Sequence, residues 1–218
     1  MKKMSAMAAG VLAAAMVSAA GAAPQVRFAD TDNNSNGNDG FRADLGADGS
    51  YEFVTFCAET QETFSYGTKY EYNISTSIKN RGGAGPLSLQ SATGYAIAYI
   101  FTTFVNQGEA GIQTLSGING FTASEYRELV QRTIWNKLYG GNTNGTFTQT
   151  RINQLFSAAS GVWTDLGNVR VMNVWDDADT ETGARQDMLM IIPLPSTAGL
   201  AGMGLFGMVA AGRRRRMA

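Results

Sequence analysis

Two short apolar segments, one at each end of the 218-residue chain, limit the part that can form a folded domain. The first segment begins with Met1-Lys2-Lys3, continues as an apolar stretch over residues 4–19 and ends in the small residues Ala20-Gly21-Ala22. A basic start, a short apolar core and small residues before a cleavage point are typical of a secretory signal peptide. We therefore expect residues 1–22 to be removed after Ala22. The less favoured alternative is an uncleaved membrane anchor.

The second apolar segment lies at the carboxyl end. Pro193-Leu194-Pro195-Ser196 precedes an apolar run over residues 197–212, which is followed by Arg213, Arg214, Arg215 and Arg216. As a helix this run would be about 24 Å long, which spans a hydrocarbon core of about 30 Å with some thinning or snorkelling. Because arginines stay on the cytoplasmic side of a membrane, the preceding domain is expected to lie outside.

These carboxyl-terminal features together resemble the PEP-CTERM sorting signals of Gram-negative bacteria. The family has glutamate between the two prolines, whereas this chain has Leu194 between Pro193 and Pro195. The resemblance implies that an exosortase-type processing enzyme cuts near residues 193–195, and that the domain before them remains at the cell surface or in the extracellular matrix. A permanent membrane anchor is the alternative. The sequence thus predicts a signal peptide (1–22), an extracellular domain (23–192) and a sorting signal (193–218).

Charge and composition exclude several functions for residues 23–192. Without the six basic residues of the two ends, 11 Lys and Arg remain against 18 Asp and Glu, a net charge of about −7, which disfavours nucleic acid as a partner. The chain has no histidine, which excludes Ser-His-Asp and Cys-His catalysis and any histidine-containing metal site. A single cysteine, Cys57, cannot form a disulfide within the chain. Its presence in an exported protein therefore needs an explanation.

The order of the elements predicts an α+β fold, with a mostly antiparallel sandwich-like or barrel-like sheet and an inserted segment of three helices. Residues 24–50 are expected to be exposed loop with one short strand at 41–43, and two alternating runs suggest a hairpin over 51–57 and 69–75. Helices are expected over 91–105, 122–139 and 148–159, the second with a Thr122–Glu125 capping box, and the last strands over 169–175 and 186–192.

Two acidic segments raise the question of calcium. Counting from Asp32 as the first position of an EF-hand loop places Ala43 at the twelfth, where glutamate is needed. A solvated turn is therefore favoured there, as it is for the acidic residues 176–181. Glu59 and Glu62 are set aside as a glycosidase pair because a strand would point them to opposite faces. No metal or cofactor is expected, although calcium binding stays open.

Three short segments in the domain resemble parts of the thioester domains found at the tips of Gram-positive pili and surface adhesins. They are Phe56-Cys57-Ala58-Glu59, Val130-Gln131-Arg132-Thr133-Ile134-Trp135 and Arg185-Gln186-Asp187-Met188-Leu189. That family shares an aromatic-Cys motif, a Thr-Gln helix motif that ends in Trp, and a late Gln. The likeness covers roughly residues 41–192. It departs from the pattern at Val130, where the family has Thr, and at Ala58, where a larger apolar residue is usual.

The resemblance implies an internal thioester between the Cys57 sulfur and the Gln186 side chain, with Gln131 and Trp135 supporting the site. Such a bond is a latent electrophile that captures an amine on a partner, so the protein would bind covalently without enzymatic turnover. Gln131 is the competing acyl donor. Gln186 ranks above it because two strands can lie side by side, whereas a helix residue must reach across a layer.

Other interpretations stay open. Cys57 would be an inert buried hydrophobe if no thioester forms, or would pair with another chain in an intermolecular disulfide. The protein would then be a structural or polysaccharide-binding surface module, for which Tyr66, Tyr70 and Tyr72 are a candidate sugar platform. The expected partners are therefore an amine-bearing surface protein or an extracellular polysaccharide.

Overall fold

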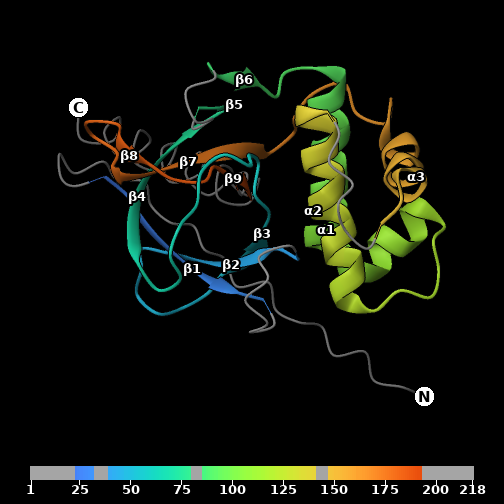
Figure 1. Cartoon of the computed structure of the whole chain (residues 1–218), viewed down its shortest axis with the longest axis horizontal. Coiled ribbons are helices and arrows are strands. Elements are labelled where there is room, and N and C mark those ends of the chain that lie inside the picture. The colour runs from blue at the N-terminus through green and yellow to red at the C-terminus, as the bar shows by residue number, and fades with distance from the viewer. Residues whose placement is uncertain (1–22, 32–38, 80–84, 141–146, 193–218) are drawn as a thin grey trace, which may run out of the picture. The chain divides into compact units, whose positions relative to one another are not determined.

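The fold was analysed in a computed structural model, which describes residues 23–31, 39–79, 85–140 and 147–192. These residues belong to one compact unit, Ala22–Ile192. It has the α+β architecture that the sequence predicts: an antiparallel sheet forms one side and three helices the other (Figure 1). The predicted signal peptide and sorting segment, with Pro193, Pro195 and Arg213–Arg216, lie outside the described residues. Among the helices described, none is long and apolar enough to cross a membrane.

The main sheet is antiparallel throughout. Its strands run in the order β3-β2-β1-β4-β7-β8, and β9 pairs with the same edge of β7 as β8 does. A separate pair, β5 and β6, stands apart from it. The bounds are β1 Gln25–Asp30, β2 Phe41–Leu45, β3 Phe53–Thr55, β4 Lys69–Ser75, β5 Ser77–Ile78, β6 Leu87–Ser88, β7 Val169–Asp177, β8 Thr182–Ala184 and β9 Met188–Ile191.

The first and last parts of this sheet meet and nearly close it into a barrel. The chain that continues β3 runs antiparallel to β9: Leu189 N–H donates to the Phe56 carbonyl at 3.0 Å, and Ala58 N–H donates to the Asp187 carbonyl at 2.7 Å. The Thr55 hydroxyl adds a bond to the Leu189 carbonyl. Closure of this kind satisfies strand edges that would otherwise be exposed. We call the contact between residues 55–58 and 187–189 the seam.

The three helices are α1 (Ala92–Ser116), α2 (Ala123–Tyr139) and α3 (Gln149–Ala159). The predicted capping box of α2 is confirmed: the Thr122 side chain accepts from Glu125 N–H, and the Glu125 side chain accepts from Thr122 N–H. The first helix extends 11 residues beyond the expected end at 105. It does so across a kink at Gly108, whose φ of 63° is accessible mainly to glycine.

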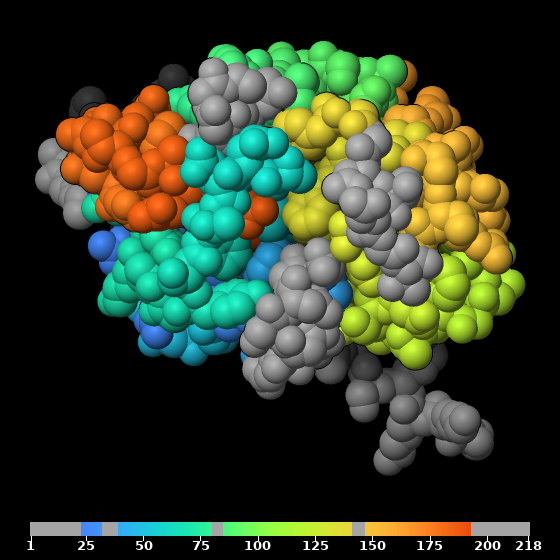
Figure 2. Space-filling view, in the orientation of Figure 1, coloured from blue at the N-terminus to red at the C-terminus, as the bar shows by residue number. Residues whose placement is uncertain are grey.

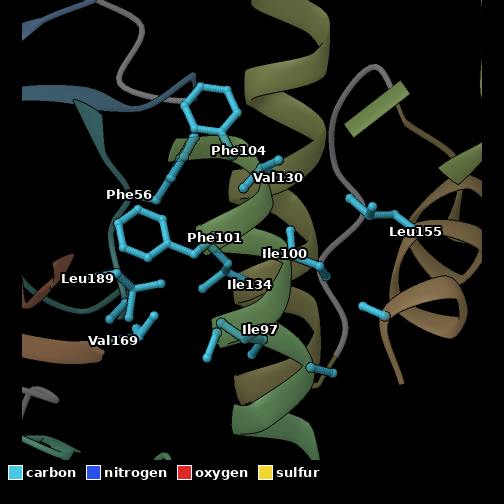
Figure 3. Close-up of a cluster of buried hydrophobic side chains, with 14 of the residues drawn as sticks. Phe56, Ile97, Ile100, Phe101, Phe104, Val130, Ile134, Leu155, Val169 and Leu189 are labelled. Carbon is cyan, nitrogen blue, oxygen red and sulfur yellow. The ribbon is translucent and has the colours of Figure 1, made fainter. Parts of the chain in front are cut away.

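The alternation of side chains along the strands creates two cores. The seam residues Phe56 and Leu189 point toward the helices, where they pack with Phe101 and Val130 among others (Figure 3). The opposite face fills the barrel interior, which contains Val26, Phe28, Phe41, Ala43, Cys57, Tyr70, Tyr72, Met172, Val174, Met188 and Met190. Cys57 therefore belongs to the barrel interior, and its neighbour Phe56 belongs to the helix–sheet core.

Two expectations for the amino-terminal half are wrong. Residues 25–30 are not loop but the strand β1, which pairs with both β2 and β4. Alternating burial along β1 shows why: Val26, Phe28 and Asp30 point inward, a period of two that the Asn-, Asp- and Gly-rich surroundings obscure. The expected hairpin of 51–57 with 69–75 does not form either, because β3 pairs with β2, and β4 with β1 and β7.

Candidate functional site

Cys57 lies in the seam, directly opposite Met188. The bonds on either side of this pair are those of Phe56 with Leu189 and of Ala58 with Asp187, so Cys57 and Met188 form a non-hydrogen-bonded pair of the antiparallel ladder. In such a pair the backbone N–H and C=O groups point away from the partner strand. Cys57 therefore needs another partner for both of its main-chain polar groups.

Gln131 of α2 is that partner. Cys57 N–H donates to Gln131 Oε1 at 2.8 Å, and Gln131 Nε2 donates to the Cys57 carbonyl at 2.9 Å. Both residues are completely buried. One side-chain amide thus makes the two bonds that a neighbouring strand would make, and it fixes the position of the Cys57 main chain. Because both amide atoms are engaged in this way, Gln131 is placed to support the site, and it is a poor candidate for the acyl donor.

Two other residues of α2 approach the same segment. Trp135 is half-buried and packs against both cores, so it lies where the barrel interior meets the helices. Its indole Nε1 is buried and has no hydrogen-bond partner among the described residues, and the Arg132 guanidinium lies 5.7 Å from the centre of its ring. One turn further on, the Tyr139 hydroxyl donates to the Ala58 carbonyl at 2.9 Å. The carboxyl-terminal half of α2 therefore holds residues 57 and 58 in place.

Gln186 approaches the cysteine from the other side of the seam. It lies between β8 and β9, two residues before Met188, so the alternation of the ladder places it on the same face as Met188 and Cys57. Residues in this diagonal relation are about 7–8 Å apart at the backbone, within reach of a glutamine side chain. The Gln186 amide is anchored, since Nε2 donates to the Glu59 carbonyl at 3.0 Å. Of the two predicted donors, Gln186 is therefore the one that shares a face with Cys57.

The segment around Gln186 is held by its neighbour Asp187. The buried Asp187 carboxylate accepts from Lys79 N–H at 2.6 Å and from Asn173 Nδ2 at 2.8 Å, with a longer bond from Val174 N–H. These donors come from β7 and from the residue after β5. A carboxylate with several donors fixes its backbone firmly, so the start of β9 and the adjacent Gln186 are rigidly placed.

The electrostatics of the site favour protonated groups. Burial raises the pKa of the Cys57 thiol well above its ordinary value, and the negative charge of Glu59 raises it further. Burial also raises the pKa of the Glu59 carboxyl from 4.5 to about 8. Hydrogen bonds from Gln61 and Glu62 N–H oppose this rise, and Asp187 adds to it. Cys57 is therefore a neutral thiol at pH 7, and it needs a base before it can act as a nucleophile.

Glu59 and Tyr139 are the contacts that sequence reasoning missed. Glu59 was considered only as half of a glycosidase pair on a strand, but residues 59–62 form a turn in which Glu59 accepts from Glu62 N–H. The available signal was an acidic residue two positions after Cys57, on the same face of an extended segment. No local pattern marks Tyr139, because its contact with Ala58 depends on how α2 packs against the seam.

The remaining sequence predictions have mixed outcomes. Tyr66, Tyr70 and Tyr72 do not form the candidate sugar platform, because Tyr70 and Tyr72 lie in the barrel interior and, of the three, only Tyr66 is exposed. In the acidic loop, Asp176 pairs with Arg185 and Glu181 pairs with Lys79. Of the EF-hand-like loop counted from Asp32, residues 32–38 lie outside the described part of the chain.

The segment that joins β3 to β4, residues 56–68, contains Cys57 and Glu59, and most of its later residues are exposed. In Figure 2 this cyan-to-teal stretch runs over the surface between the orange carboxyl-terminal strands and the yellow α2. Gln186 is only half-buried, whereas Cys57 is completely buried. The side chain that would supply the acyl carbon is thus closer to the surface than the sulfur.

No protein-family model matches the chain, and no curated protein matches it. Solved structures do. An N-terminal thioester domain of a surface protein from Clostridium perfringens is 16% identical with a TM-score of 0.48, and the match covers 78% of this chain and 99% of that one. The N-terminal thioester domain of the fibronectin-binding protein SfbI from Streptococcus pyogenes is 12% identical with a TM-score of 0.44, and the match covers 78% of this chain and 94% of that one.

Proposed function

We propose that this chain is an exported surface or extracellular-matrix protein that captures an amine-bearing partner through an internal thioester between Cys57 and Gln186. The observation that carries the proposal is the seam itself. Gln131 makes both main-chain hydrogen bonds of a completely buried Cys57, while Gln186 lies on the same face across the ladder with its amide anchored at Glu59. A held cysteine main chain and an anchored glutamine amide on the same face are what a reacting pair requires.

The chemistry follows from proximity. The Cys57 sulfur attacks the side-chain carbonyl carbon of Gln186, the C–S bond forms, the C–N bond breaks, and ammonia leaves. The burial of Cys57 keeps water from hydrolysing the product. A partner's lysine amine then attacks the same carbon, forms an isopeptide bond and releases the thiol. This is a single capture event rather than turnover, and the reactive groups are supplied by the ladder without any histidine.

Export and sorting belong to the same proposal. Residues 1–22 direct the chain out of the cytoplasm, and Pro193, Pro195 and Arg213–Arg216 frame a sorting segment for an exosortase-type enzyme. A covalent trap for a partner outside the cell has to be exported before it can meet that partner. Membrane fractionation of the wild type and of a variant with Arg213–Arg216 replaced by alanine tests sorting. A protein that is fully soluble in both cases and still begins at Met1 would refute it.

Intact mass is the direct test of the thioester. The purified protein, kept under non-reducing conditions, is expected to be lighter than its sequence by one ammonia, and methylamine should restore the mass with one adduct. The Cys57→Ala variant should show neither change. Peptide mapping should place the methylamide on Gln186 and leave Gln131 unmodified. A wild-type mass equal to the sequence, with Cys57 titrating as a free thiol on unfolding, would contradict the proposal.

A non-covalent binding module is the second candidate. The complete burial of Cys57 and the raised pKa of its thiol favour it, since both are properties of an inert core cysteine. This candidate predicts binding of an extracellular polysaccharide that survives Cys57→Ala and consumes no methylamine. The proposed covalent capture predicts that the same substitution abolishes stable attachment to the partner.

A further inference from the structure

Glu59 is a buried carboxyl group beside the seam to which the proposed bond assigns no role. Its side chain is completely buried, and its carboxylate accepts from Gln61 N–H at 2.5 Å and from Glu62 N–H at 3.1 Å. No lysine or arginine of the described residues forms an ion pair with it. A carboxyl group buried without a cation is costly for a fold, so its presence calls for a chemical explanation.

The groups that face Glu59 are acids. Cys57 and Glu62 lie on its own segment, Asp187 faces it from the residues before β9, and Tyr139 approaches the neighbouring Ala58 from α2. Burial raises the pKa of the Glu59 carboxyl to about 8, and the negative charges of Asp187 and Glu62 add to the rise. At neutral and mildly alkaline pH it therefore exists in both protonation states, which is the property that a group transferring protons requires.

Glu59 also lies beside both reacting residues. Its main-chain carbonyl accepts from Gln186 Nε2 at 3.0 Å, and this nitrogen is the one that leaves as ammonia. Glu59 follows Cys57 by two residues on the same face of an extended segment, and its negative charge adds to the rise that burial causes in the pKa of the Cys57 thiol. Glu59 thus supplies a buried carboxyl group between the residue that must lose a proton and the residue that must gain one.

We propose that Glu59 carries the proton in formation and aminolysis of the thioester, an inference that rests on the proposed Cys57–Gln186 bond. In formation, the carboxylate takes the thiol proton as sulfur attacks Gln186. The resulting carboxylic acid then gives that proton to the departing nitrogen, which leaves as ammonia, and the carboxylate is restored. In capture, the carboxylate takes a proton from the attacking amine and gives it to the departing Cys57 thiolate.

The test measures aminolysis by hydroxylamine, which is uncharged over the neutral and alkaline range, so its own ionisation does not enter the rate. Intact mass follows the adduct with time. The rate for the wild type is expected to rise with pH and level off above an inflection near 8. Glu59→Gln should slow the reaction about 100-fold and remove the inflection, because general acid–base assistance typically contributes that much or more. Glu62→Gln, which removes a nearby carboxyl group, is the matched control: it should keep the wild-type plateau rate and retain the inflection, shifted to lower pH because the negative charge of Glu62 raises the pKa of the Glu59 carboxyl.

The outcomes separate this inference from the function on which it rests. Glu59→Gln could also fold and fail to form the thioester, so that its mass never falls by one ammonia. If Glu62→Gln does form the thioester, this result also supports the proton-carrying role. A wild-type profile with no inflection overturns that role whether or not Glu59→Gln folds, and so does a Glu59→Gln protein that reacts at the wild-type rate. A wild type that shows no thioester refutes the proposed function itself.

Discussion

Replacing Gln131 with methionine tests how the Cys57 main chain is held. The two side chains are similar in length, but methionine has neither the acceptor for Cys57 N–H nor the donor for the Cys57 carbonyl. Both main-chain groups would then be buried without partners. Each such group costs about 1–3 kcal/mol, so the free energy of unfolding should fall by about 2–6 kcal/mol. Since domains of this size are stable by about 5–15 kcal/mol, the loss is large and measurable.

The assay is urea unfolding followed by tryptophan fluorescence, with both proteins in a Cys57→Ala background. Alanine keeps the main-chain hydrogen bonds and removes any contribution of the thioester as a cross-link. Gln154→Met is the matched control: Gln154 is a half-buried helix glutamine whose Nε2 donates to the Ser116 carbonyl at 2.8 Å, and whose Oε1 accepts an exposed bond from Arg151 at 3.3 Å. It should cost about 1 kcal/mol.

In the Cys57 background, Gln131→Met should also reduce the fraction of protein that is lighter by one ammonia, because the sulfur is no longer held against Gln186. Gln154→Met should leave that fraction unchanged. If Gln131→Met costs no more than its control and the thioester still forms fully, Gln131 does not position Cys57, and the reasoning from the seam fails.

Three further predictions concern the scaffold. Gly94→Ala places a methyl carbon 1.8 Å from the Leu89 carbonyl oxygen and should cost about 3 kcal/mol in thermal or urea unfolding, whereas Gly85→Ala, where nothing lies within 4 Å, should be neutral. Thr122→Ala removes the cap of α2 and should cost about 1 kcal/mol, and a change within measurement error would contradict the capping box. Folding binds a proton to Glu59 because its pKa rises from 4.5 to about 8, so wild-type stability should fall as pH increases across that interval. Glu59→Gln should flatten this fall and be the more stable protein above pH 8, and an unchanged pH dependence of the urea midpoint would refute the shift.

Local patterns predicted the parts of the fold that depend on local chemistry. The Thr122–Glu125 pair marks the start of α2 as expected, because caps are satisfied by residues within one turn, and the helix ends at residue 139 as expected. The order of strands and helices was sufficient for the α+β class. Strand pairing was not predictable in the same way. The strand β4 pairs with β1 and β7, which lie far from it in sequence, and the residues 69–75 contain no pattern that indicates these partners.

The candidate site shows the same division. Cys57, Gln131 and Gln186 were selected from three short segments, and the structure brings all three to the seam. Their roles depend on geometry that the sequence does not state. The sequence alone leaves Gln131 open as an acyl donor, whereas its two bonds to the Cys57 main chain give it a supporting position. The sequence predicts a strand at Glu59, whereas the structure has a turn there.

Burial at the seam creates a conflict that the neighbouring residues resolve. A thioester survives only where water is excluded, yet the same exclusion raises the pKa of the Cys57 thiol and makes its nucleophilic form scarce. Proximity across the ladder offsets part of this cost, since groups held in reactive geometry reach effective molarities of about 10⁵ M or more. The remaining difficulty is the proton, which cannot pass to bulk water from a buried sulfur. A carboxyl group that is buried beside both reacting residues and changes protonation state near pH 8 can move it.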